Sequence, residues 1–114
     1  MSIKDERVFL RHMLDAARQA REYAQGRSRA DLERDPLLRD GFVRQLTIIG
    51  EAAGRVSKAT RSAHPDVPWP DLVGMRNRIV HEYFRVDLDI VWATVQFDLP
   101  ELISQLDNLL GREG

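Results

Sequence analysis

Residues 88–110, LDIVWATVQFDLPELISQLDNLL, show the clearest structural pattern in the chain. Large apolar side chains recur there at alternating steps of three and four residues, which is the spacing of one face of a bundle helix. The series is Trp92, Val95, Leu99, Leu102, Leu106 and Leu109. Pro100 interrupts it, and because proline has no backbone N–H, we expect a kink or a restart near that residue.

Three further segments predict helices by the same periodicity. They run over residues 5–25, from residue 36 to about 60, and from residue 70 to about 84. Gly26 is expected to cap the first helix, and Asp35 before Pro36 to start the second. The small residues of GEAAG (residues 50–54) suit a close helix approach. With no β-type alternation of any length, the sequence predicts an all-α, up-down bundle of four main helices in one domain, residues 1–114.

Composition restricts the chemistry more than it identifies it. The chain has 114 residues, 17 lysines and arginines against 18 acids, and no cysteine. A net charge of −1 gives no overall nucleic-acid signature, and the missing cysteines exclude disulfides and thiolate catalysis. His12, His64 and His81 lie on separate elements without metal-ligand spacing, so we expect neither metal nor cofactor. No apolar run approaches the roughly 20 residues of a membrane span, so a cytoplasmic protein is expected.

The stretch RNRIVHEYF, residues 76–84, combines polar groups that a purely structural helix would not need. On a regular helix Arg76 falls in the middle of the apolar face, and Tyr83 lies nearly beneath it with its ring toward the bundle. Asn77 and His81 stack on the neighbouring flank. A buried, unpaired charge is very costly, so Arg76 should have a counter-charge, for which Glu51 is our candidate.

Together these groups suit RNA cleavage. A guanidinium fork matches a phosphodiester, and an imidazole moves protons near neutral pH. The substrate's own 2′-hydroxyl would then be the nucleophile, so the protein needs no serine, cysteine or metal. Taken singly, each residue also has a structural interpretation. The arginine could be a salt-bridge partner, the histidine a surface group, and the tyrosine a core residue with its hydroxyl at the rim.

The same stretch resembles the R-x4-H motif of HEPN domains, in the R-N-x-x-x-H-x-Y form of HepT-like toxins. The segments ERVFLRHMLDAARQAREY, LTIIGEAAGRVS, VPWPDLVGMRNRIVHEYF and DLDIVWATVQFDLPELISQL are also similar to that family in order and spacing. The resemblance therefore covers nearly the whole chain.

This resemblance implies a homodimeric, metal-independent ribonuclease toxin of a type VII toxin–antitoxin pair. Its partner would be MntA, a small nucleotidyltransferase that transfers AMP to the tyrosine of the motif. Carried over, Arg76 and His81 become the catalytic pair, Asn77 their support and Tyr83 the modified residue. The RNA groove would draw on Arg78 and Arg85, with Arg44, Arg55 and Lys58 as further candidates.

Two structural questions and three functions stay open at this point. Residues five apart on a regular helix point about 140° away from each other, so Arg76 and His81 need a distorted helix or a second subunit to meet. Ile48, beside Thr47, Glu51 and Arg55, marks a candidate dimer face. Besides the toxin, the sequence allows a non-catalytic HEPN binding module that docks a nucleotidyltransferase or a nucleotide. It also allows a plain helical dimerisation domain.

Overall fold

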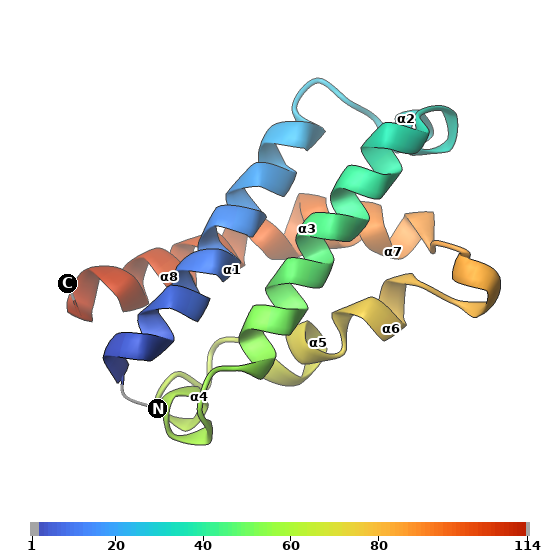
Figure 1. The fold of residues 1–114 in the computed structure, drawn as a ribbon. Helices are drawn as coiled ribbons and strands as arrows, with labels where there is room; N and C mark the ends of the chain where they lie inside the picture. The colour runs from blue at the N-terminus through green and yellow to red at the C-terminus, as the bar shows by residue number, and fades with distance from the viewer. Residues whose placement is uncertain (1–2, 114) are drawn as a thin grey trace.

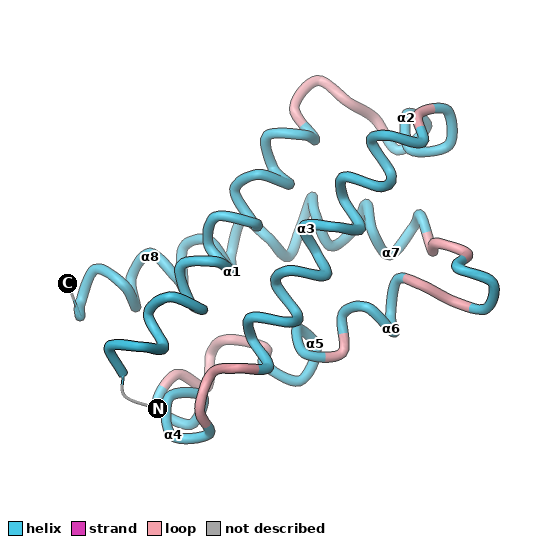
Figure 2. Tube along the Cα trace, in the orientation of Figure 1, coloured by secondary structure: helices cyan, strands magenta, loops and turns pink. Residues whose placement is uncertain are grey.

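The computed structural model describes residues 3–113, which form a bundle of helices (Figure 1). The longest helices are α1 (Ile3–Ala24), α3 (Pro36–Gly54) and α8 (Leu99–Glu113). Helices α1 and α3 run side by side, and α8 packs against α1 behind them in this view. Shorter helices join these three: α2 (Arg29–Arg34), α4 (Lys58–Ala63), α5 (Trp69–Val73), α6 (Met75–Ile79) and α7 (Leu88–Ala93). The described range contains no strand (Figure 2), which confirms the all-α prediction.

The predicted apolar faces form the core. Met13 and Ala20 of α1, Phe42 and Leu46 of α3, and Leu106 of α8 are all fully buried. Alanines on the inner side of α1 leave room for the two neighbouring long helices to approach closely. None of the helices within residues 3–113 is both long and apolar enough to cross a membrane.

The predicted helix boundaries hold at the first turn between helices. Gly26 has a left-handed φ of +72° and ends the turn after α1. Asp35 accepts a hydrogen bond from the Leu38 N–H at 3.2 Å, with Pro36 at the first helical position. Between them, the segment expected to be a break contains α2, whose start is fixed by the Asp31 carboxylate accepting from the Ser28 N–H at 2.7 Å.

The second helix is shorter than predicted, because α3 ends at Gly54 and α4 begins after Ser57. Ser57 caps α4 by accepting from the Thr60 N–H at 3.2 Å. The buried carboxylate of Glu6 binds the same turn, accepting from the Ser57 N–H and, at 2.6 Å, from the Thr60 hydroxyl. Arg61 donates at 3.0 Å to the Ala53 carbonyl at the end of α3, which also accepts from the Val56 N–H at 3.2 Å.

The third helix, predicted as continuous over residues 70–84, is broken twice. Gly74 separates α5 from α6, and the chain leaves the helix at Val80, where φ is −116° and ψ is 122°. Val80 then forms an antiparallel bridge with Val86, and a single 3₁₀ turn, η1 (Glu82–Phe84), lies between them. The β-branched Ile79–Val80 pair suits this switch to extended backbone.

The fourth helix restarts next to Pro100, as expected. A π-helical turn, η2 (Thr94–Asp98), lies between α7 and α8, and the Leu99 N–H bonds to the Thr94 carbonyl. The next bond of that kind would need an N–H on Pro100, which leaves the Val95 carbonyl without a donor. Arg21 of α1 donates to this carbonyl at 3.1 Å and to the Gln96 amide oxygen at 2.7 Å.

Candidate functional site

Arg76 lies on the exposed side of α6 and lines a hollow of about 320 Å³ between α3 and α5–α6. The hollow is lined by Thr47, Gly50, Glu51, Gly54, Arg55, Val73 and Arg76. The prediction that Arg76 sits within the apolar face is wrong, because the break at Gly74 lets Met75 and Ile79 fill the core instead. Within the described residues no ion pair joins Arg76 to Glu51, although both line this hollow.

Gly50 holds α5–α6 close to α3. A Cβ atom at this position would lie 2.7 Å from the Leu72 carbonyl oxygen and 3.4 Å from the Met75 Cβ. Only glycine permits this approach without a shift of backbone. At Gly54, in contrast, an added Cβ would meet nothing within 4 Å. Of the two glycines of GEAAG, Gly50 therefore has the close-approach role that the sequence indicated.

His81 lies outside any helix, which corrects the helical position predicted for it beside Asn77. Its backbone is extended, with φ −107° and ψ −164°, and its N–H donates to the Arg85 carbonyl at 2.7 Å. On the other side of the bridge, the Asp87 N–H donates to the Ile79 carbonyl at 2.7 Å. These two hydrogen bonds close a hairpin-like loop, residues 80–86, at the end of α6.

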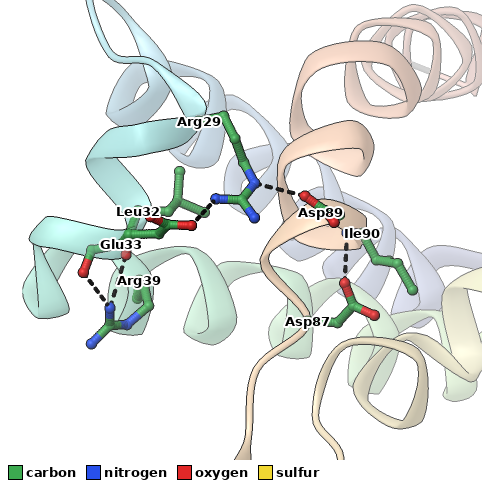
Figure 3. Close-up of polar contacts among 7 residues, drawn as sticks. All are labelled: Arg29, Leu32, Glu33, Arg39, Asp87, Asp89 and Ile90. Atoms are coloured by element: carbon green, nitrogen blue, oxygen red, sulfur yellow. Dashed lines mark hydrogen bonds and ion pairs between the residues drawn. The ribbon is translucent and has the colours of Figure 1, made fainter.

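Asp87 is the residue that sequence reasoning missed. One of its oxygens, Oδ2, lies 3.5 Å from the His81 Nε2. The other, Oδ1, accepts from the Ile90 N–H at 3.1 Å and caps α7, as Figure 3 shows. The His81 and Asp87 side chains are 38% and 31% exposed, so the pair is open to a substrate. An aspartate directly before the helical run LDIVWA is a recognisable N-cap, and that pattern could have found it.

The start of α7, and with it Asp87, is tied to α2. Arg29 donates to Asp89 at 2.8 Å and to Glu33 at 3.0 Å (Figure 3). These hydrogen bonds raise the pKa of Arg29 above its ordinary value, and the bond to Asp89 contributes most. Arg39 donates to the Leu32 and Glu33 carbonyls, both at 3.0 Å, and closes the end of α2.

Tyr83 and Phe84 form the tip of the loop. Tyr83 is 98% exposed and Phe84 79% exposed. Both have left-handed backbone conformations, with φ of 56° and 60°. The expectation that the Tyr83 ring faces the bundle is therefore wrong, because the chain turns outward two residues before it.

The remaining predicted site residues are dispersed around α6 and the loop. Asn77 and Arg85 are exposed. Arg78 is half-buried and lines a separate hollow of about 240 Å³ beside α8, together with Asp71, Asp98 and other residues. The structure thus brings His81 to Asp87, and Arg76 to the same hollow as Glu51. Within the described residues no hydrogen bond or ring contact joins the Arg76 and His81 side chains.

Metal ligands do not cluster in this region. Within residues 3–113 no group of three or more histidine, cysteine, aspartate or glutamate side chains is placed to hold a metal ion. His12 lies on α1, His64 follows α4, and His81 lies in the loop.

Comparison with known proteins shows the family of the chain. A family model described as "Ribonuclease HepT-like" matches residues 13–109. The chain belongs to this HepT-like family. The match confirms the resemblance seen in the sequence and includes α6, the loop and α7.

Relatives of this HepT-like chain are similar over most of its length. "Putative RNase TTE0752" of Caldanaerobacter subterraneus subsp. tengcongensis is 40% identical over 111 residues, which is 97% of this chain and 99% of the relative. "Putative RNase MJ1380" of Methanocaldococcus jannaschii is 31% identical over 107 residues, 94% of this chain and 98% of the relative. "Probable ribonuclease HepT" of Thermococcus cleftensis is 37% identical over 67 residues, 59% of this chain and 61% of the relative. No solved structure matches the chain significantly.

Proposed function

We propose that this protein is a metal-independent endoribonuclease and the toxin of a toxin–antitoxin pair. The observation that carries the proposal is the His81–Asp87 pair, held at 3.5 Å on a closed loop directly after the arginine-bearing helix. A histidine with a carboxylate on one ring nitrogen is oriented for proton transfer through the other. The names of the HepT-like relatives support RNA as the substrate.

In the proposed reaction the ribose 2′-oxygen attacks the adjacent phosphorus, and the bond from phosphorus to the 5′-oxygen breaks. His81 takes the proton from the 2′-hydroxyl or gives one to the departing 5′-oxygen. Arg76 stabilises the charge on the pentacoordinate phosphate, and Asn77 supports the phosphate or the imidazole by hydrogen bonds. The products are a 2′,3′-cyclic phosphate and a 5′-hydroxyl. Two further arginines, Arg78 on α6 and Arg85 in the loop, would contact the phosphates on either side of the cleaved one.

A second subunit completes this site. No hydrogen bond or ring contact joins Arg76 to His81 within the described chain, so we propose that the Arg76 of one protomer acts with the His81 of its partner in a homodimer. The open hollow around Arg76 supports this arrangement, because it is bordered by Gly54 and by Val73, which is 44% exposed. Light scattering should give a dimer at micromolar concentration, and a monomer of 13.1 kDa would argue against a shared site.

Tyr83 is the proposed site of control. A partner nucleotidyltransferase resembling MntA would transfer AMP from ATP to the phenol oxygen, releasing pyrophosphate. The near-complete exposure of Tyr83 supports this step, since another enzyme could reach the hydroxyl without unfolding the chain. The added phosphodiester carries a negative charge and would compete with RNA phosphate for the arginines. Intact mass after incubation with the partner and ATP should rise by AMP units in the wild type and not in Tyr83→Phe.

Variants of the two catalytic candidates test the core of the proposal. Arg76→Ala and His81→Ala should each abolish RNA cleavage and growth inhibition while the far-ultraviolet circular dichroism stays unchanged, because both side chains are exposed. Cleavage by the wild type should persist in EDTA. Loss of cleavage in EDTA with recovery on adding a divalent metal would refute metal independence.

The alternative function is a non-catalytic module that docks a nucleotidyltransferase or a nucleotide. The observation that favours it is that no hydrogen bond or ring contact joins the Arg76 and His81 side chains in the described chain. On this alternative, the wild type binds the partner but leaves RNA intact at any protein concentration, and His81→Ala binds the partner as tightly as the wild type does.

A further inference from the structure

The tip of the loop presents two aromatic rings to solvent in a conformation that such residues rarely adopt. Tyr83 and Phe84 are consecutive, both lie in the left-handed region, and neither is a glycine or an asparagine. Isolated large apolar side chains on a surface need no explanation, but a pair held outward against the backbone preference points to a use. The proposed AMP transfer accounts for Tyr83 and leaves Phe84, which has no hydroxyl, without a role.

The tip is held firmly by its base. The Val80–Val86 bridge and the hydrogen bond from the His81 N–H to the Arg85 carbonyl close the loop on both sides. Within it, the Arg85 N–H donates to the Glu82 carbonyl at 3.2 Å. The backbone around Phe84 is therefore held by hydrogen bonds. A ligand that contacts the ring would lose little free energy in ordering the loop.

Arg85, next to Phe84, suits a ligand that combines phosphates with flat, unsaturated groups. Arg85 follows Phe84 directly, and His81 lies three residues before it, at most about 11 Å away along the chain. Glu82 within the tip and Asp87, 3.5 Å from the His81 ring, are acidic, so Arg85 is the permanently charged cation next to Phe84. An exposed aromatic ring beside an arginine is an arrangement by which proteins stack the bases of single-stranded nucleic acid while binding its phosphates.

We propose that Phe84 is a positioning residue on which a base of single-stranded RNA stacks, next to the phosphate cleaved at His81. The proposal rests on the ribonuclease function proposed above and adds its substrate class. Bases within a duplex are already stacked on their neighbours, so a platform of this kind selects unpaired segments. Stacking fixes the nucleotide relative to His81 but takes no part in the bond changes.

Substitutions at Phe84 separate stacking from plain apolar contact. Affinity for a short single-stranded RNA would be measured in the non-cleaving His81→Ala protein, and KM and kcat in the otherwise wild-type protein. Phe84→Ala should weaken binding and raise KM by about 5- to 150-fold, the range expected for loss of one stacked base. Phe84→Leu should lose about as much, whereas Phe84→Trp should keep affinity within about twofold of the parent.

Phe97 provides the matched control. It is 76% exposed, nearly as much as Phe84, but lies on the π-helical turn η2. Phe97→Ala should leave KM unchanged. An RNA with abasic ribose units around the cleavage site should bind the parent as weakly as normal RNA binds Phe84→Ala. Combining the abasic RNA with Phe84→Ala should cost no further affinity.

Each contrary result identifies what failed. Wild-type affinity in Phe84→Leu would show apolar contact without stacking. Intact RNA affinity in Phe84→Ala with lost AMP transfer to Tyr83 would make the tip a docking surface for the modifying enzyme. Dissociation of a Phe84→Ala dimer into monomers would make it a contact between subunits. If the wild type still cleaves RNA, each of these results overturns the stacking proposal and leaves the proposed ribonuclease function standing. A wild type that neither binds nor cleaves RNA overturns both.

Discussion

Substitution of Asp87 can separate its two tasks, because its two oxygens have different partners. Oδ1 caps α7 through the Ile90 N–H, and Oδ2 faces the His81 Nε2. Asparagine caps helices about as well as aspartate, so Asp87→Asn should change the free energy of unfolding by less than about 0.5 kcal/mol. The same variant removes the carboxylate from the imidazole. Asp87→Ala loses both interactions.

The expected magnitudes follow from the exposure of the pair. Ion pairs between side chains as exposed as these, at 38% and 31%, contribute roughly 0.2–1 kcal/mol. If that interaction orients His81 in the transition state, its loss lowers kcat by up to about fivefold. Asp87→Asn should therefore cleave RNA about two- to fivefold more slowly at unchanged stability. Asp87→Ala should show the same loss of rate and, in addition, lose about 1 kcal/mol of stability with its helix cap.

Steady-state cleavage of a short RNA and urea unfolding, both at fixed protein concentration, measure the two effects. Asp35 is the matched control, since it caps α3 through the Leu38 N–H at 3.2 Å and its ion pair, at 3.6 Å, is with Arg27 rather than with a histidine. Asp35→Ala should lose a similar amount of stability and keep its kcat. Cleavage by Asp87→Asn at the wild-type rate would refute the orienting role. An equal loss of rate in Asp35→Ala would attribute the effect to stability instead.

Two further predictions concern the packing that supports the site. Gly50→Ala, measured by urea unfolding, should lower stability by about 1–2 kcal/mol, because the new Cβ would lie 2.7 Å from the Leu72 backbone oxygen; equal or higher stability would contradict this close approach. Gly54→Ala is its control and should be neutral or up to about 1 kcal/mol more stable. Burial raises the pKa of Glu6, but hydrogen bonds from Thr60 and Ser57 outweigh it and bring the pKa below its ordinary value. Glu6 thus stabilises the fold above its unfolded-state pKa of about 4.3, and that contribution is lost as the pH falls through the lower folded-state pKa. In unfolding measurements between pH 6 and about 3, the free energy of unfolding should fall less for Glu6→Gln than for the wild type. An equal fall in both proteins would show that ionised Glu6 does not stabilise the fold.

The parts of the fold that sequence predicted well are those in which periodicity and burial agree. The stripes of α1, α3 and α8 became the core, and Asp35 with Pro36 began α3 as expected. Long helices with one apolar face have few alternative packings, so their pattern is informative. Short helices are less predictable, because α2 and α4 depend on caps and on distant partners such as Glu6.

The π-helical turn shows how a local rule can locate a disturbance without showing how the chain accommodates it. Proline at position 100 must leave one carbonyl without its helical donor, and the sequence predicted a disturbance there. What it could not show is that Arg21, 74 residues earlier than Val95, reaches the freed carbonyl. With that bond in place the chain passes through a widened turn, and α8 restarts at Leu99.

The loop after Ile79 has the largest consequence for function. On a continuous helix, Tyr83 would lie almost beneath Arg76 with its ring toward the bundle. Only its hydroxyl, at the rim of the bundle, would be open to an enzyme. Ending the helix at Ile79 reverses this geometry. The bridge from Val80 to Val86 turns the intervening residues outward, which brings His81 to Asp87 and leaves Tyr83 almost wholly exposed. The eight residues from Arg76 to Tyr83 therefore cross the end of α6 and do not lie along one face of a helix. Its arginine belongs to the packed bundle, whereas its histidine and tyrosine belong to a loop that substrates and a modifying enzyme can reach.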